Sequence, residues 1–258
     1  MNRMLDDFVD HSPEKARRWL ERLARDAMRE RDLDPDPPQE ALAELKALGA
    51  SVAEARDGVQ DLRHLPWCSI DNDDSLDLDQ LTCAEAIAGA RTRLLVAVAD
   101  VDALVRAGGA IDGHARHNTT SVYVPGTTFH MLPEELSTDR TSLNLGEDRY
   151  ALVVSFEVGP DGEVNGGEVC RAVVRNRAKL AYRSLGEWLE GDGPLPPAAA
   201  AVPGLENDLR LQDSAALEED LKTGQLRDTL REMILAYRRQ KIGLTKGGQG
   251  PIIQQTNI

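Results

Sequence analysis

The sequence predicts an α+β protein in which a helical region at the front precedes several strands, which are followed by further helices. Apolar residues recur every three to four positions between residues 12 and 49, whereas short β-like runs dominate from about residue 62 onwards. The chain has 258 residues and is 41% hydrophobic, which is enough for a substantial core. We therefore predict a helical region over residues 1–60 and a larger domain over residues 61–258.

Two amphipathic helices are predicted in the front region. The first covers residues 12–30, with Ser12 as its N-cap and Pro13 at its first helical position. The proline-rich run DLDPDPPQ then breaks the helix. A shorter helix restarts over residues 40–49 and ends at Gly49, a residue that commonly follows the last helical turn.

The larger domain is predicted to contain strands over residues 93–101, 120–125, 150–158 and 168–182, with a hairpin turn at 159–164. The rest is predicted as a helix over 183–191, a proline- and alanine-rich linker over 191–204, a helix around 225–240 and a weakly structured tail over 244–258. These patterns do not fix the order of the strands within a sheet.

Composition excludes several classes of protein. The formal net charge of −14 argues against a protein that coats nucleic acid with its whole surface, although a local cationic channel remains compatible with it. No apolar stretch approaches the roughly 20 residues of a membrane-spanning helix, and the first residues lack the apolar centre of a secretory signal. We therefore expect a cytoplasmic protein without a membrane partner. The three cysteines form no C-x-x-C pair that would indicate a zinc site or a redox motif.

The densest chemical feature is the string SIDNDDSLDLDQ, which places five aspartates between residues 71 and 79. Carboxylates this close repel one another and resist burial unless a cation or water compensates them. The string is therefore either a solvated acidic loop or a divalent-metal site.

A calcium loop is excluded, because that motif needs a glycine at its sixth position and a glutamate at its twelfth. Counted from Asp71, these positions hold Leu76 and Thr82. A magnesium site fits better, since Mg²⁺ takes oxygen ligands and lets water and substrate phosphate complete its octahedron. In an extended segment, Asp77 and Asp79 share one side while the interleaved leucines anchor the other.

The string resembles the signature of the ribonuclease II family, whose exoribonuclease domain is called RNB. The resemblance continues in the same order through VAVADVDALVRAGG, SVYVPG and VVRNRAKLAY and covers roughly residues 61–240. It implies a mixed or antiparallel sheet flanked by helices. It also implies a hydrolytic nuclease that uses Mg²⁺, or alternatively Mn²⁺, to degrade single-stranded RNA from its 3′ end into nucleoside 5′-monophosphates.

Carried over position by position, the aspartates of the family motif fall on Asp71, Asp77 and Asp79, which become the predicted metal ligands and catalytic residues. Gln80 stands where the motif has its final aspartate. An amide oxygen can ligate Mg²⁺ but carries no charge, so this departure bears on two-metal chemistry.

The resemblance also implies residues that contact RNA. The family's base-stacking tyrosines match Tyr123 and Tyr182, and stacking on aromatic rings tolerates every base. In one extended strand through residues 171–183, basic side chains would all point to one side and apolar ones to the other. Arg175, Arg177 and Lys179 are therefore predicted to contact the RNA backbone.

The resemblance stops before the later half of a complete RNB domain, so we predict an incomplete domain, for which a second chain could supply the missing half. Two alternatives to the nuclease stay open. The first is a catalytically inactive RNA-binding or partner-binding module, or a fragment, derived from the family. The second is a protein with an acidic surface loop and no role in nucleic-acid binding.

Overall fold

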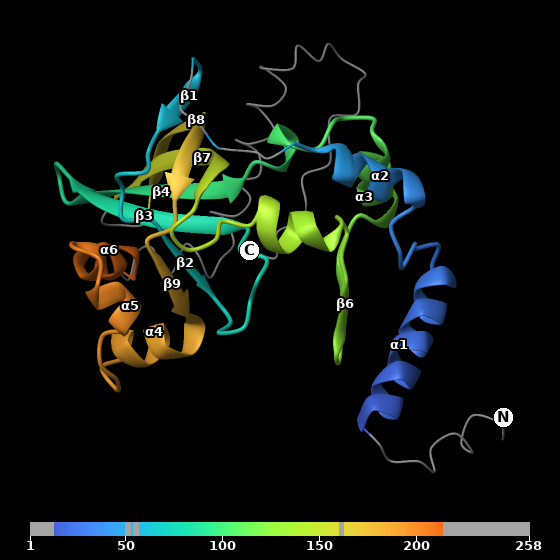
Figure 1. Cartoon of the computed structure of the whole chain (residues 1–258). Coiled ribbons are helices and arrows are strands. Elements are labelled where there is room, and N and C mark those ends of the chain that lie inside the picture. The colour runs from blue at the N-terminus through green and yellow to red at the C-terminus, as the bar shows by residue number, and fades with distance from the viewer. Residues whose placement is uncertain (1–12, 50–52, 54–56, 160–162, 214–258) are drawn as a thin grey trace. The chain divides into compact units, whose positions relative to one another are not determined.

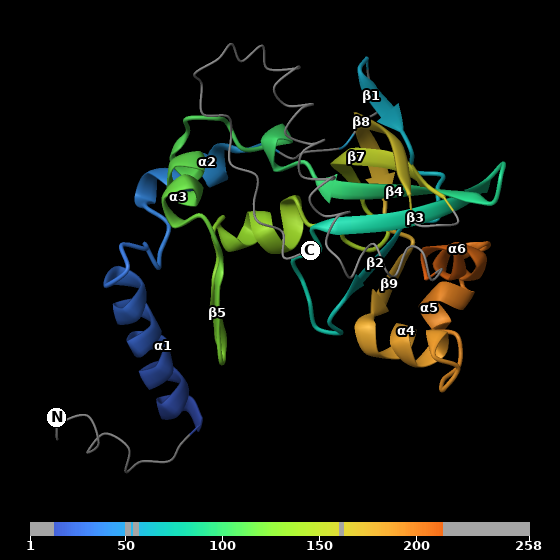
Figure 2. The same ribbon diagram turned by 180° about the vertical axis from the view of Figure 1, so that it is seen from behind.

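The structure is a computed structural model that describes residues 13–49, 53, 57–159 and 163–213 (Figures 1 and 2). These residues belong to two compact units. The described parts of the first unit are residues 13–49 and 105–134, and those of the second lie within 50–104 and 135–213. The helical N-terminal region thus shares a unit with residues 105–134, which the sequence did not predict. The predicted helix around 225–240 and the tail over 244–258 lie outside the described residues.

The first unit combines helices with one β-hairpin. Its elements are α1 (Pro13–Arg29), α2 (Gln39–Ala47), α3 (Ala110–Asn118), β5 (Val122–Val124) and β6 (Thr127–Phe129). Both helices predicted at the front are confirmed, with bounds that differ by one or two residues. The predicted strand over 120–125 is the first arm of the hairpin. Gly126 has φ +87° in the two-residue turn between β5 and β6, a conformation that glycine adopts without strain.

A partly buried contact connects α2 to α3 within this unit. One carboxylate oxygen of Glu44 accepts the backbone N–H groups of Ala110 at 2.6 Å and Ile111 at 3.1 Å. These are N–H groups of the first helical turn, which have no partner inside the helix, and a negative charge is favourable there. Glu44 therefore caps α3 from a helix 66 residues earlier in the chain.

The second unit is a curled sheet with helices on one side (Figure 1). Its elements are β1 (Val59–Asp61), β2 (Cys68–Asp71), β3 (Gln80–Ile87), β4 (Arg91–Ala99), β7 (Asp148–Val158), β8 (Val164–Arg175), β9 (Ala178–Ala181), α4 (Tyr182–Leu189), α5 (Pro197–Ala200) and α6 (Leu205–Gln212). Short helical turns cover Val101–Ala103 and Leu136–Arg140. The strand order is β1-β8-β7-β4-β3-β2-β9. β1 runs parallel to β8 and β2 runs parallel to β9, whereas the other pairs are antiparallel.

This arrangement confirms the predicted α+β class and the mixed, mostly antiparallel sheet. The hairpin predicted at 159–164 is also present, since β7 and β8 pair antiparallel up to Val158 and Val164. β8 lies next to one edge of the sheet and β9 forms the other edge, yet only residues 176 and 177 separate them in sequence. The sheet therefore curls until its two ends approach each other.

Two layers of apolar side chains stabilise the unit. The inner layer gathers Leu81, Ala97, Val153 and Val174 from β3, β4, β7 and β8, together with Trp67, which precedes β2. The second layer packs α4, α5 and α6 against β2 and β9 and includes Cys68, Leu180, Trp188 and Leu209. Burying one large apolar side chain contributes roughly 1.5–3 kcal/mol, so both layers support the strands that carry the site.

The predicted linker over 191–204 is partly packed. It contains α5, and Ala199 in that helix is fully buried in the layer between the helices and β9. Proline at a helix start and alanine inside a helix are favourable, so this composition suits a short helix as well as a linker. Among the described residues, no helix is both long and apolar enough to span a membrane.

Candidate functional site

The aspartate string forms the connection from β2 to β3. Asp71 is the last residue of β2, and Gln80 is the first residue of β3. The loop between them, residues 72–79, ends where the Asp79 carbonyl accepts the N–H of Ala99 in β4 at 2.9 Å. We call this connection, residues 71–79, the acidic loop. Figure 1 shows it extending beyond the end of β2, on the side of α4.

The leucines of the acidic loop differ in environment. Leu78 is 3% exposed and belongs to the inner apolar layer, so it anchors the loop as predicted. Leu76 is 62% exposed, so the expectation that both leucines anchor the segment is wrong for this residue. The regular alternation of a strand begins only at β3, and Leu76 precedes it.

The three motif carboxylates act on one another electrostatically. Burial, followed by the negative charges of Asp71 and Asp77, raises the pKa of Asp79 from 3.8 to about 6. Asp73 and Asp74 are exposed to solvent. Asp71 and Asp77 thus act electrostatically on Asp79, whereas Asp73 and Asp74 lie at the surface.

Tyr182 lies beside this cluster because of the parallel pairing of β2 and β9. Asp71 stands opposite Ala181 in the register, and Tyr182 follows as the first residue of α4. The ring is 57% exposed. Partial burial, followed by the charges of Asp71 and Asp79, raises the pKa of the Tyr182 phenol. The phenol is thus within electrostatic reach of the carboxylates while its ring remains accessible.

Tyr123 belongs to the first unit. It lies in β5 opposite Thr128 of β6 and is 60% exposed. An exposed aromatic ring on a hairpin is suited to stacking, but its relation to the acidic loop stays a prediction.

The sequence predicted one extended strand with a cationic face through residues 171–183, but the structure divides this segment among several elements. β8 ends at Arg175, β9 covers only Ala178–Ala181, and Arg183 already lies in α4, so the expectation of one extended strand through residues 171–183 is wrong. The chain turns at Asn176, which is 1% exposed, and its side-chain amide donates hydrogen bonds to the Ser69 hydroxyl and the Leu143 carbonyl, both at 3.0 Å. These bonds stabilise the break between the strands.

The three predicted RNA-binding cations have separate partners. Arg175 forms an ion pair with Asp148 at 2.6 Å. The guanidinium of Arg177 donates to the Arg63 carbonyl at 2.5 Å. Lys179 donates to the Ser75 carbonyl at 2.6 Å and so contacts the acidic loop.

The donor set of the site suits a hydrated magnesium ion. In the part of the chain that the structure describes, no group of three or more His, Cys, Asp and Glu side chains could hold a metal ion as it stands. Mg²⁺, however, is usually bound by one or two carboxylates, with waters and substrate phosphates completing its shell. The side-chain amide oxygen Oε1 of Gln80 adds an observation that fits this: it is buried and has no hydrogen-bond partner among the described residues. Such an oxygen has lost its hydration and can accept a cation or its water.

The sequence did not predict the buried polar residues that support the acidic loop. Ser142 and Asn176 are almost fully buried, at 2% and 1% exposed, and both bond to backbone or side-chain groups near the loop. The only available indication was small polar residues next to apolar ones in TSLN and VRNRA. That pattern is too common in loops to identify a supporting role.

The sequence profile of the RNB domain matches residues 59–247, which is most of the chain. The chain therefore belongs to the RNB domain family, as its sequence motifs predicted.

Individual relatives agree with this assignment. The chain is 38% identical to ribonuclease R of Vibrio cholerae over 182 residues, which is 70% of this chain and 22% of the relative. It is 36% identical to ribonuclease R of Escherichia coli over 186 residues, covering 70% and 23%. Exoribonuclease 2 of Cronobacter sakazakii is 35% identical over 144 residues, covering 55% and 22%. The chain thus corresponds to less than a quarter of the length of these relatives.

Solved structures confirm the fold. The structure of Mycoplasma genitalium RNase R in complex with double-stranded RNA matches with a TM-score of 0.69 and 23% sequence identity. The match covers 84% of this chain and 36% of that one. At this identity the likeness concerns the fold alone.

Proposed function

We propose that this chain carries the metal-binding part of an exoribonuclease that hydrolyses single-stranded RNA from the 3′ end and releases nucleoside 5′-monophosphates. The observation that supports the proposal is that the charges of Asp71 and Asp77 act on Asp79, in a loop that Lys179 and the parallel pairing of β2 with β9 connect to the segment of Tyr182, inside the region that matches the RNB domain. The relatives are named ribonuclease R and exoribonuclease 2, which supports RNA hydrolysis as the reaction class.

In this proposal Asp71, Asp77 and Asp79 hold a divalent cation, with Mg²⁺ as the expected metal and Mn²⁺ as the alternative. When bound, the cation would activate a water molecule and stabilise the oxygen that leaves from the phosphodiester. The carboxylates must be ionised to act as ligands, and Asp79, with a pKa of about 6, is fully ionised only above that pH in the metal-free protein.

The residues around the cluster would position the RNA. The exposed ring of Tyr182 is suited to stack on a base next to the carboxylates. Stacking is worth roughly 1–3 kcal/mol per base and is tolerant of base identity, which suits an enzyme that removes every nucleotide in turn. Tyr123, Arg175, Arg177 and Lys179 remain predicted RNA contacts, although the present partners of the three cations would have to be exchanged for phosphate.

The experiment that tests this function follows the direction and the products of the reaction. A single-stranded RNA labelled at its 5′ end is expected to shorten gradually, and a 3′-labelled one to release labelled nucleoside 5′-monophosphate from the start. Internal fragments, or products with a 3′-phosphate, would contradict the proposed reaction. EDTA should stop the reaction, and added Mg²⁺ or Mn²⁺ should restore it.

A second candidate function is an RNA-binding module without catalytic activity. Gln80 favours it, because this residue stands where the family motif has its final aspartate. Such a module would bind single-stranded RNA in a salt-dependent manner but would release no nucleotides. A filter-binding titration beside the nuclease assay separates the two candidates.

A further inference from the structure

A buried hydroxyl group holds the backbone of the acidic loop on both sides of one metal-ligand candidate. Ser142 is 2% exposed and lies in the segment before β7. Its Oγ accepts the N–H of Leu78 at 3.0 Å and donates to the carbonyl of Leu76 at 2.8 Å. These two backbone groups flank Asp77, so one side chain fixes the peptide planes before and after that residue.

Two further hydrogen bonds hold the backbone of the acidic loop. The N–H of Leu143 donates to the Leu78 carbonyl at 2.7 Å, and Lys179 donates to the Ser75 carbonyl. Because the orientation of neighbouring peptide planes sets the direction of each Cα–Cβ bond, these bonds set the direction in which the side chains of Asp77 and Asp79 leave the backbone.

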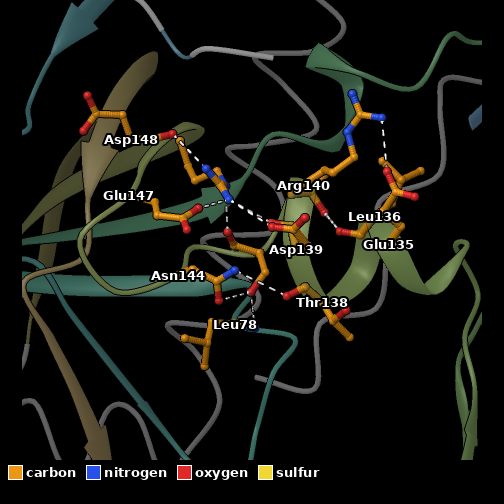
Figure 3. A network of polar contacts seen from close by, with 12 residues as sticks. Leu78, Glu135, Leu136, Thr138, Asp139, Arg140, Asn144, Glu147 and Asp148 are labelled. Carbon is orange, nitrogen blue, oxygen red and sulfur yellow. Dashed lines mark hydrogen bonds and ion pairs between the residues drawn. The ribbon is translucent and has the colours of Figure 1, made fainter. Parts of the chain in front are cut away.

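Ser142 is itself held by a polar network, which Figure 3 shows from close by. The carbonyl of Ser142 accepts a hydrogen bond from Arg149 Nε at 3.0 Å, and Arg149 Nη2 donates to the Asp139 carbonyl at 3.0 Å. The side chain of Asn144 donates to the Thr138 carbonyl at 3.3 Å. In Figure 3, Leu78 of the acidic loop lies next to Asn144, below the helical turn that carries Thr138 and Asp139.

This helical turn, Leu136–Arg140, has π-helical hydrogen bonding, a rare geometry that recurs near functional sites. The turn, the following segment and the start of β7 are thus connected by hydrogen bonds to the acidic loop. A rigid support of this kind is what a metal site needs, because its ligands must be held to within about 0.5 Å and 10–20° of their working geometry.

We propose that Ser142 is a positioning residue for the metal ligands Asp77 and Asp79. It contacts neither RNA nor metal and acts through the backbone of Leu76 and Leu78. The inference rests on the proposed function, because it names the residue that orders the ligands of that site. Loss of groups that orient metal ligands typically weakens metal affinity or activity about 10- to 100-fold, which sets the size of the expected effect.

The test measures Mn²⁺ binding to the full chain by electron paramagnetic resonance, without RNA. Ser142→Ala is expected to weaken Mn²⁺ binding about 10- to 100-fold. Ser142→Thr, which keeps the hydroxyl, should restore at least part of the affinity. In the nuclease assay, Ser142→Ala should lower kcat and raise the Mn²⁺ concentration needed for half-maximal rate, while the KM for RNA stays close to that of the parent.

Thr141→Val provides the matched control. Thr141 is the adjacent buried residue, and its hydroxyl donates to the Leu136 carbonyl at 2.8 Å rather than to the acidic loop. This variant loses one buried hydrogen bond, so its thermal stability should fall, whereas its Mn²⁺ affinity should equal that of the parent. If Ser142→Ala does not fold, Ser142→Cys, which keeps the side-chain size and weakens both bonds, replaces it in the comparison.

The outcomes are distinguishable. A folded Ser142→Ala variant with the Mn²⁺ affinity of the parent would overturn the positioning role and leave the proposed function intact. Equal weakening by Thr141→Val would also overturn it, because the effect would then reflect general stability. A parent chain that binds no Mn²⁺ would refute the proposed metal site, and the inference with it.

Discussion

Asp208 should make the stability of the second unit depend on pH in a way that one substitution removes. This residue of α6 is 3% exposed. One of its carboxylate oxygens accepts the N–H of Ala84 in β3 at 2.6 Å, and the other accepts a hydrogen bond from Gln212 at 2.5 Å. β2 begins at Cys68, which pairs with Thr82 of β3. Because the two strands are antiparallel, Ala84 of β3 lies past the first residue of β2, and its N–H has no partner in that strand. Asp208 thus provides that strand group with its partner.

The size of the effect follows from the pKa. Burial raises the pKa of Asp208 to about 6, from 3.8, despite the opposing influence of the two hydrogen bonds. Between these two pH values the folded state binds more protons than the unfolded state, so the contribution of Asp208 to stability falls as the pH rises. The difference of about 2 pKa units, at 1.36 kcal/mol each, lowers the free energy of unfolding by up to about 3 kcal/mol as the pH rises. This loss of stability is complete above pH 6.

The assay compares Asp208→Asn with the parent by urea unfolding, followed by circular dichroism, at several pH values from 4 to 8. Asparagine keeps an acceptor for Ala84 and cannot ionise. The free energy of unfolding of the variant minus that of the parent should therefore rise by up to about 3 kcal/mol from pH 4 to pH 7. Asp192→Asn makes the same change at an exposed site and is the matched control, so the pH dependence seen with Asp208→Asn should exceed that seen with Asp192→Asn. A pH-independent difference for Asp208→Asn, or one that falls with pH, would refute the reasoning.

Two further predictions concern the site itself. Gln80→Asp places the missing carboxylate beside the cluster, so Mg²⁺ should raise the thermal unfolding temperature of this variant more than that of the parent; an equal rise would contradict a role of position 80 in metal binding. Tyr182→Ala should weaken the binding of single-stranded RNA about 5- to 150-fold, corresponding to roughly 1–3 kcal/mol, whereas Tyr182→Phe should bind like the parent. Equal losses in both Tyr182 variants would point to the hydroxyl rather than to stacking.

The sequence predicted the fold class because periodicity is a local property. The helices at the front, β4, β7 and the later part of β8 all have strong apolar patterns of their own. The break between β8 and β9 was missed because it depends on Asn176, whose bonds are to Ser69 and Leu143, 107 and 33 residues away. A pattern of alternating basic and apolar residues contains no information about such distant partners.

For the candidate site, too, the sequence predicted local features but not those that depend on residues distant in the chain. The motif identified Asp71, Asp77 and Asp79, and the structure adds the electrostatic coupling between them. The motif could not indicate that Tyr182 lies beside Asp71, because that follows from the parallel register of β2 with β9. Nor could it reveal that Arg175 is paired with Asp148, since an isolated arginine in a sequence carries no sign of its partner.

The most direct test of the proposed metal-dependent nuclease is a time course on 5′-labelled single-stranded RNA with Mg²⁺. It compares the parent chain with Asp79→Asn and with Asp73→Asn, which makes the same change of charge at an exposed position of the same loop. We predict progressive shortening by the parent and by Asp73→Asn, and a rate at least about 100-fold lower for Asp79→Asn. Equal rates for all three proteins, or a folded parent that binds RNA without shortening it, would contradict the account.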